Sequence, residues 1–319
     1  MAPALRVVCF LLIGAASCAA SVTNRSGGSV EDEEPKPWSS ETFGGLELRS
    51  IGPALMSGRI ADIAVPAGAP NTWYVGVGSG GVWKTTNAGT TWKSIFDGQG
   101  SFSIGDVAID PNNPHTVWVG TGENVGGRHV AFGDGVYLSK DAGKTWENRG
   151  LKASEHIGKI IIHPSDSNTV WVAAEGPLWS KGGDRGVYKT NDGGKTWKNV
   201  LRVGEWTGAT DLEIDPRDPN VLYAAAWQRH RTVAAYVGGG PESGIYRSVD
   251  GGENWERLET GLPKGNMGKI GLALSPMKPD VLYAAIEQDR RKGGVYRSTD
   301  RGSSWEKRSD AVSRATGPH

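Results

Sequence analysis

Cysteine is nearly absent from this chain of 319 residues, and so is any excess of charge. Cys9 and Cys18 both lie among the first twenty residues, so a mature chain beginning after Ala20 has neither a disulfide framework nor thiol chemistry. Lys plus Arg and Asp plus Glu each total 35, and this balance argues against a nucleic-acid-binding protein, which needs a basic surface. Glycine (47) and tryptophan (13) are plentiful instead, as is typical of a turn-rich β protein.

Long hydrophobic runs are also missing. The longest apolar stretch, residues 7–16, follows Arg6 and precedes small residues, which predicts a secretion signal over residues 1–20. It is too short to span a bilayer, so we expect no transmembrane segment in the mature chain and a secreted, periplasmic or cell-surface location. A lipid anchor at Cys18 and an ordinary buried N-terminal segment are the alternatives. Residues 21–45 are polar and rich in Pro, Gly and Ser, which predicts a flexible linker.

Five segments of the chain repeat one pattern. They are TTNAGTTW (85–92), SKDAGKTW (139–146), TNDGGKTW (190–197), SVDGGENW (248–255) and STDRGSSW (298–305). Their tryptophans are 54, 51, 58 and 50 residues apart, and a period near 50 indicates a repeat architecture.

Each repeat contains four short strand patterns. Each begins with an apolar strand, a Pro/Asn/Asp turn and a second strand. A variable loop then precedes a third strand such as GVYKT, and the shared turn is followed by a fourth strand that begins at the tryptophan. Four antiparallel strands per repeat predict an all-β fold, a β-propeller, with its domain over 46–319. The predicted blades are 57–97, 103–150, 157–203, 210–260 and 268–308, and 46–52 is an orphan fourth strand.

The shared turn has a structural explanation for each fixed residue. Asn or Asp at its third position can accept backbone N–H groups two residues on, glycine at the fifth adopts positive φ, and tryptophan packs within or between blades. A calcium loop is excluded because the alternating oxygen ligands and the distant glutamate are missing. The residues assigned these structural roles are Asn87, Gly89, Trp92, Asp141, Gly143, Trp146, Asp192, Gly194, Trp197, Asp250, Gly252, Trp255, Asp300, Gly302 and Trp305.

These turns resemble the Asp box, S/T-x-D-x-G-x-T/S-W, of the Asp-box or BNR-repeat proteins. Asn87 and Asn254 are departures from that pattern. The chain most resembles secreted bacterial proteins with a sortilin N-terminal-type propeller, which are often labelled glycosyl-hydrolase-like. The resemblance is carried by the segments SIGPALMSGRIADIAV, GVGSGGVWKTTNAGTTW and VGTGENVGGR. The resemblance implies the fold and leaves function open. Its members usually continue into more blades, so we expect an incomplete part of a larger propeller; a closed five-bladed ring is the alternative.

Ligands of propellers usually meet the face opposite the Asp boxes, where the loops vary most. Candidate ligand-binding residues there are Arg59, Glu123, Asn124, Arg128, His129, His156, Glu175, Trp206, Trp227, Arg229 and His230. The same loops also carry Trp179, Arg231, Glu287, Asp289, Arg290 and Arg291. Several aromatic and charged groups on one rim are typical of a ligand site.

The sequence favours binding over catalysis, and two alternatives to a binding module remain open. The favoured function is a sortilin-like binding module for a peptide, protein or glycan, with Trp227 and Arg229 as direct contacts. The first alternative is a glycoside hydrolase whose weak catalytic candidates, Glu123 and Glu175, occupy equivalent ends of second strands. The second is a scaffold for protein assembly. We expect no cofactor and no metal, and His129 and His156 are not interpreted as metal ligands.

Overall fold

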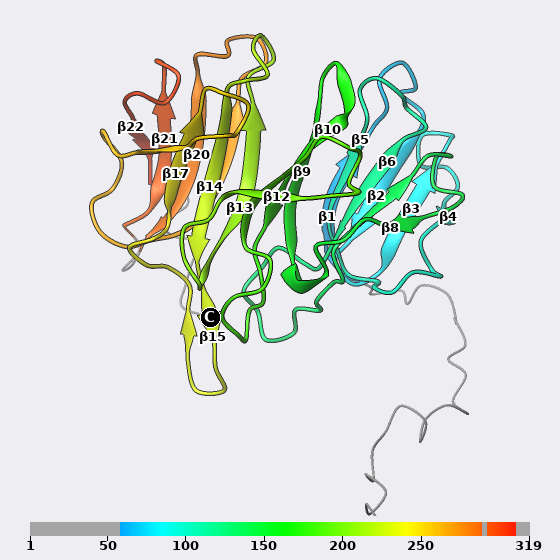
Figure 1. Ribbon diagram of the computed structural model, residues 1–319, viewed down its shortest axis with the longest axis horizontal. Coiled ribbons are helices and arrows are strands. Elements are labelled where there is room, and N and C mark those ends of the chain that lie inside the picture. Colours follow the sequence, from blue (N-terminus) through cyan, green and yellow to red (C-terminus); the bar gives the residue numbers. More distant parts are fainter. Residues whose placement is uncertain (1–57, 289–291, 311–319) are drawn as a thin grey trace, which may run out of the picture. The chain divides into compact units, whose positions relative to one another are not determined.

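The computed structural model describes residues 58–288 and 292–310. The predicted leader, linker and orphan strand, together with Asp289, Arg290 and Arg291, lie outside these ranges. The described part of the chain is all-β and forms five four-stranded antiparallel sheets, blades 1 to 5, side by side in chain order (Figure 1). No helix in 58–288 or 292–310 is long and apolar enough to cross a membrane.

The strands of the five blades have the following bounds. Blade 1 contains β1 (Ile60–Ala64), β2 (Trp73–Val77), β3 (Gly81–Thr85) and β4 (Lys93–Ser94). Blade 2 contains β5 (Ile104–Ile109), β6 (Val117–Thr121), β7 (Val136–Ser139) and β8 (Glu147–Asn148). Blade 3 contains β9 (Ile157–His163), β10 (Asp166–Ala174), β11 (Gly186–Thr190) and β12 (Lys198–Leu201). Blade 4 contains β13 (Thr207–Ile214), β14 (Leu222–Gln228), β17 (Gly244–Ser248) and β18 (Glu256–Leu258). Blade 5 contains β19 (Met267–Leu274), β20 (Leu282–Gln288), β21 (Gly294–Ser298) and β22 (Glu306–Ser309).

The sequence did not predict two details of this arrangement. The long loop of blade 4 contains its own hairpin, β15 (His230–Arg231) with β16 (Tyr236–Val237), at the bottom of Figure 1. Each fourth strand begins one residue after the box tryptophan rather than at it. A short 3₁₀ turn, Lys152–Ser154, connects blades 2 and 3.

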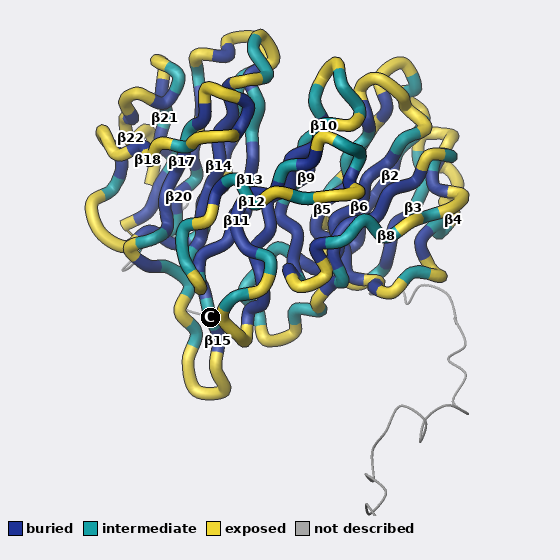
Figure 2. Tube along the Cα trace, in the orientation of Figure 1, coloured by how far each residue is buried: buried dark blue, intermediate teal, exposed yellow. Residues whose placement is uncertain are grey.

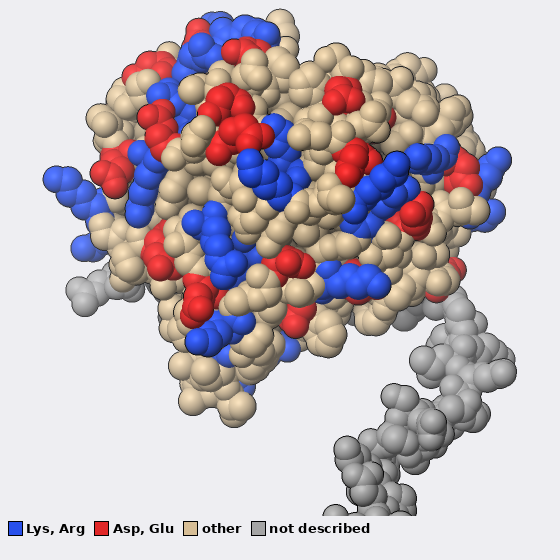
Figure 3. Space-filling view, in the orientation of Figure 1, with Lys and Arg blue, Asp and Glu red and all other residues tan. Residues whose placement is uncertain are grey.

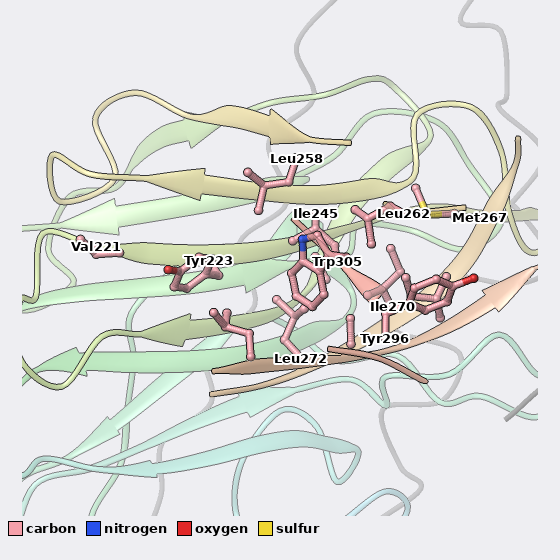
Figure 4. Packing of buried hydrophobic residues seen from close by; sticks show 14 residues of the cluster. Val221, Tyr223, Ile245, Leu258, Leu262, Met267, Ile270, Leu272, Tyr296 and Trp305 are labelled. Carbon is pink, nitrogen blue, oxygen red and sulfur yellow. The ribbon is translucent and has the colours of Figure 1, made fainter. Parts of the chain in front are cut away.

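The apolar core lies between successive blades, so the second and third strands are largely buried while most connecting loops and the outermost strand β22 are exposed (Figure 2). Between blades 4 and 5, Trp305 packs with Tyr223 and Leu258 of the preceding blade (Figure 4). The indole of Trp146 in blade 2 likewise reaches blade 1, where it donates a hydrogen bond of 2.7 Å to the Ile95 carbonyl. The box tryptophans of blades 2 to 5 therefore join neighbouring blades, and removing an indole as buried as that of Trp305 typically costs about 3–5 kcal/mol.

The Asp boxes close on themselves through hydrogen bonds. In blade 2, Asp141 Oδ1 accepts backbone N–H groups from Lys144 at 2.9 Å and Thr145 at 2.8 Å. The acceptor reaches three and four residues on, not two as the sequence analysis expected, because the two intervening residues form the left-handed bend. Ala142 (φ 61°) and Gly143 (φ 86°) are both left-handed, which confirms the need for glycine.

Charged side chains link the first strands of successive blades. Asp62 in β1 accepts the Val107 N–H of β5 at 3.2 Å, and Asp106 in β5 accepts the Ile160 N–H of β9 at 2.8 Å. Lys159 in β9 also donates to Asp106 at 2.9 Å, and the charge of Asp106 raises the pKa of this lysine. Asp211 in β13 accepts the Leu272 N–H of β19 at 2.7 Å. We call Asp62, Asp106, Lys159 and Asp211 the first-strand charge series.

Candidate functional site

The candidate residues lie where the second strands end and the variable loops begin. Backbone pairing places Glu175 opposite His156, as Gly122 is opposite Ser103 in blade 2. Glu175 is therefore equivalent to Gly122, and Glu123 lies one residue further along its loop. The expectation that Glu123 and Glu175 are equivalent is wrong, since a shift of one residue points a side chain in the other direction.

Glu123 has a buried carboxylate, of which only one oxygen has a partner. Oε1 forms an ion pair with Arg59 from the segment before β1, whose other terminal nitrogen lies 3.0 Å from His129 Nε2. Glu123 is 3% exposed, and its Oε2 is buried without a hydrogen-bond partner. Such an orphaned oxygen is uncommon in a folded protein and indicates a place where a further donor can bind. Arg59 and His129 are exposed and cover it.

His156 contacts the loop that carries Glu123 through a hydrogen bond to its backbone. Its Nδ1 lies 3.0 Å from the Glu123 carbonyl, and since a carbonyl only accepts, Nδ1 carries the hydrogen. Burial, with the nearby Arg229 charge, lowers the pKa of His156 to about 3. The ring is therefore neutral and buried, so His156 positions Glu123. The expectation that His156 faces a ligand is corrected.

Glu175 and Arg229 form a buried ion pair. Their closest oxygen and nitrogen are 2.6 Å apart, and the two side chains are 1% and 0% exposed. Arg229 also donates to the Val125 carbonyl at 2.7 Å and the Gly176 carbonyl at 3.3 Å. The pair thus ties the loops of blades 2, 3 and 4 together. Neither group is placed to touch a ligand, which corrects the expectation of direct contact.

Trp227 is buried beside this pair. Its indole donates to the Gly238 carbonyl at 3.0 Å, and the cations of Arg229 and Lys269 lie 5.0 and 5.5 Å from its ring centre. Lys269 in turn donates to the Asn124 carbonyl at 2.5 Å, and burial lowers the pKa of Lys269. The expected ligand contact of Trp227 is therefore also corrected, because the indole supports the loops.

Asn124 and the blade 4 hairpin complete the loop network. The side chain of Asn124 donates a hydrogen bond to the Thr210 backbone carbonyl at 3.0 Å and accepts one from the Thr210 hydroxyl at 2.9 Å. Arg231 donates twice to the Gly126 carbonyl, at 3.1 and 2.8 Å, and Arg128 donates to the Val233 carbonyl at 3.0 Å. Loops of blades 2 and 4 are thereby held together.

Aromatic side chains at this end are partly accessible. Trp179, in the loop after β10, is 48% exposed. Trp206, between blades 3 and 4, has its ring centre 4.6 Å from that of His230. A buried cation lies beneath: Arg185 donates to the Glu175 carbonyl at 2.8 Å and lies 5.9 Å from the Trp206 ring centre. Exposed rings beside fixed polar groups are the composition expected of a ligand-binding surface.

Four residues of this network were not candidates from the sequence: Arg185, Thr210, Lys269 and Tyr236, whose ring centre lies 4.4 Å from the Arg231 cation. Lys269 lies two residues before Gly271, which occupies the first-strand position of Asp106 and Asp211, so that position gave no signal for it. Within the described ranges no group of three or more His, Cys, Asp or Glu could hold a metal ion. Charges of both signs intermingle on the face shown in Figure 3.

Known proteins resemble this chain in part. Residues 134–239 match the Sortilin-Vps10 family, described as sortilin, neurotensin receptor 3. Xyloglucanase Xgh74A of Acetivibrio thermocellus is 27% identical over 213 residues, which are 58% of this chain and 23% of the relative. The oligoxyloglucan-reducing end-specific xyloglucanase of Emericella nidulans is 25% identical, over 63% of this chain and 24% of the relative. The chain thus spans about a quarter of the length of these relatives.

Solved structures agree on the fold. The GH74 enzyme of Niastella koreensis gives a TM-score of 0.57 at 22% identity, covering 78% of this chain and 38% of that one. An ancestral GH74 enzyme gives 0.58 at 19% identity, covering 79% and 34%. Together with the five antiparallel sheets and their boxes, this confirms the predicted Asp-box β-propeller fold, of which residues 134–239 resemble the sortilin family.

Proposed function

We propose that the loop end of blades 2 to 4 takes part in hydrolysing a xyloglucan-type polysaccharide, with Glu123 as one of the two carboxylates that such a reaction uses. The relatives named xyloglucanase support this hypothesis over peptide binding. The observation that carries it is the state of Glu123: one oxygen held by Arg59, the other buried without a partner.

Glu123 is better suited to this role than Glu175. Glu175 Oε2 makes no hydrogen bond but lies 2.6 Å from the buried Arg229 cation in an ion pair, and its Oε1 accepts from the Thr210 hydroxyl at 3.3 Å. Glu123 is covered by the exposed side chains of Arg59 and His129, and that of Arg59 is 52% exposed. Withdrawal of Arg59 brings the orphaned oxygen within reach of a glycosidic oxygen or a water molecule.

The test is release of reducing ends from xyloglucan by the chain and by Glu123→Gln and Glu175→Gln. The proposal expects Glu123→Gln to lose about a hundredfold in rate, the minimum for a general acid or base, at an unchanged melting temperature. Glu175→Gln is the matched control and should mainly lower the melting temperature. Equal rates for Glu123→Gln and the unchanged chain would overturn the assignment.

Glycan binding without hydrolysis is the second candidate, and the exposed Trp179 favours it. An exposed indole offers an apolar face on which a sugar ring can pack. Titration with xyloglucan oligosaccharides, followed by tryptophan fluorescence, tests it. Trp179→Ala should weaken binding, while Phe102→Ala, an exposed ring before blade 2, serves as the control. Binding without any release of reducing ends would favour this function over hydrolysis.

A further inference from the structure

The turn between the first and second strands is built in the same way in blades 2 and 4. Asp110 and Asp215 each donate their N–H to the carbonyl of the residue before the second strand, at 3.0 and 2.9 Å. The Oδ1 atom of each aspartate accepts the backbone N–H two residues on, from Asn112 at 2.8 Å and from Arg217 at 2.9 Å. Asp110 and Asp215 therefore occupy equivalent positions, and both are buried.

In blade 4, arginine side chains hold the second oxygen of this carboxylate. Asp215 Oδ2 accepts from Arg217 at 2.8 Å and from Arg301 at 3.2 Å. Arg301 follows the box Asp of blade 5, so its guanidinium crosses from one blade to the next. Arg247, on the third strand of blade 4, donates to the Arg301 carbonyl at 2.9 Å. Three guanidinium groups, those of Arg217, Arg247 and Arg301, thus lie at this end of the junction between blades 4 and 5.

The junction of blades 2 and 3 has no arginine at these three positions. The residues that stand there are, in the same order, Asn112, Leu138 and Gly193. Gly193 follows the box Asp of blade 3 and is left-handed like Arg301, with φ of 69° against 60°, so the backbone is alike and the side chain is missing. Asp110 Oδ2, the atom equivalent to the one that binds Arg301, is buried without a hydrogen-bond partner.

A cavity of about 300 Å³ lies beside this carboxylate. Asp110 and Leu138 of blade 2 and Gly193 of blade 3 contribute to its lining, so it occupies the place that arginine side chains fill between blades 4 and 5. It lies at the box end of the propeller, opposite the end of the second strand that leads to Glu123. Its volume suits a small ligand, and a buried carboxylate oxygen without a donor is costly to leave unpaired.

The same cavity also offers hydrogen-bond donors. Trp118 Nε1 and Arg149 Nε belong to its lining, and each is buried without an acceptor. Two exposed lysines, Lys140 and Lys195, line it as well. A ligand that satisfies both kinds of group carries a cationic donor for Asp110 and, a few bonds away, an anionic acceptor.

We propose that this cavity binds arginine, either free or as the C-terminal residue of a peptide. The guanidinium donates to Asp110 Oδ2, as that of Arg301 does to Asp215 Oδ2, and the α-carboxylate accepts from the donors around Arg149. A guanidinium is the cation best matched to a carboxylate in a buried place, because it is planar and weakly hydrated. The contact that the chain makes internally between blades 4 and 5 is thus left to a separate molecule between blades 2 and 3.

Isothermal titration calorimetry of the full chain tests this proposal with four probes. L-Arginine and the peptide Gly-Gly-Arg should bind. L-Citrulline, which has the shape of arginine without the side-chain charge, should bind about tenfold or more weakly, since a charge-assisted hydrogen bond is lost. Agmatine, which is arginine without its carboxylate, should be weakened for the same reason. Tighter binding of Gly-Gly-Arg than of arginine would identify a peptide C-terminus as the source of the ligand, and the reverse would identify the free amino acid.

Two variants place the binding in this cavity. Asp110→Asn keeps the Oδ1 acceptor and removes the charge, so it should weaken arginine binding about tenfold or more. Gly193→Arg restores the side chain that blade 5 supplies and should abolish binding; its Cβ has room, since the nearest atom, Asn168 Oδ1, would be 3.4 Å away. Asp97→Asn, at an exposed aspartate outside the cavity lining, is the matched control and should bind arginine unchanged.

Near-ultraviolet circular dichroism confirms that each variant is folded. The absence of saturable binding for both arginine and Gly-Gly-Arg would overturn the proposal. So would citrulline that binds as tightly as arginine, or binding that neither Asp110→Asn nor Gly193→Arg weakens. Agmatine that binds as tightly as arginine would overturn the role given to the carboxylate.

Discussion

Arg229→Met should strongly destabilise the fold, because Arg229 is the tie between three loops. The substitution keeps an unbranched apolar stem but removes the ion pair with Glu175 at 2.6 Å and the bonds to Val125 and Gly176. Removing one partner of a buried pair typically costs about 3–5 kcal/mol, and the hydrogen bonds are included in that range. At roughly 2–4 °C per kcal/mol for a domain of this size, the melting temperature should fall by roughly 6–20 °C.

Thermal unfolding followed by circular dichroism measures this loss, with Arg128→Met as the control. Arg128 is exposed and makes one bond, to Val233, so its loss should stay near 0.5 kcal/mol. The double variant Arg229→Met with Glu175→Gln should recover part of the stability, because it no longer leaves a buried charge unpaired. A loss below about 1 kcal/mol for Arg229→Met would refute the structural role, and Arg229 would again be a candidate for ligand contact.

Three further predictions concern pH and backbone space. Because the pKa of His156 is lowered from 6.5 to about 3, only the unfolded chain takes up its proton as pH falls below 6.5, so urea unfolding should show about 2 kcal/mol less stability at pH 5 than at pH 7.5. His156→Gln should remove this difference. The pKa of Asp250 is lowered from 3.8 to about 2 by hydrogen bonds from Asn254, so its contribution is present above 3.8 and lost toward pH 2; Asp250→Asn should flatten acid unfolding in that window only. Gly122→Ala should unfold the loop end, since its Cβ would lie 1.8 Å from the Glu155 carbonyl at φ +87°, whereas Gly98→Ala, with open space around it, should change the melting temperature little.

Much of the fold could be predicted from the sequence because the repeating element is local. The Asp box closes within eight residues, from Ser139 to Trp146, so its hydrogen bonds and its left-handed glycine depend on neighbours in sequence. The offset of the bonds from Asp141 was misjudged because the left-handed pair Ala142–Gly143 lengthens the bend by a residue or two. The repeat period was thus sufficient to predict the blades, whereas the exact hydrogen bonds of each turn could be seen only in the structure.

The site could be predicted only as a region. Its bonds join residues far apart in sequence, such as Arg229 with Val125 and Lys269 with Asn124, and no local pattern indicates such pairs. Charged residues in variable loops were interpreted as ligand contacts, yet Arg229, Glu175 and His156 are buried structural groups. Loops that pack against one another bury backbone groups that need hydrogen-bond partners. Polar side chains in such loops can fill this need as well as contact a ligand, and the sequence does not distinguish the two roles.

The first-strand charge series has a consequence for how such repeats can be rearranged in evolution. The five boxes are nearly interchangeable, but Asp106 requires a cation after it, and Lys159 requires the acid that precedes it. Asp106 already has the like charge of Asp62 on its other side, which raises its pKa, and Lys159 offsets that charge. A duplicated copy of blade 2 would replace Lys159 with a further aspartate, so this one ion pair restricts recombination at the junction of blades 2 and 3, whereas the boxes do not restrict it.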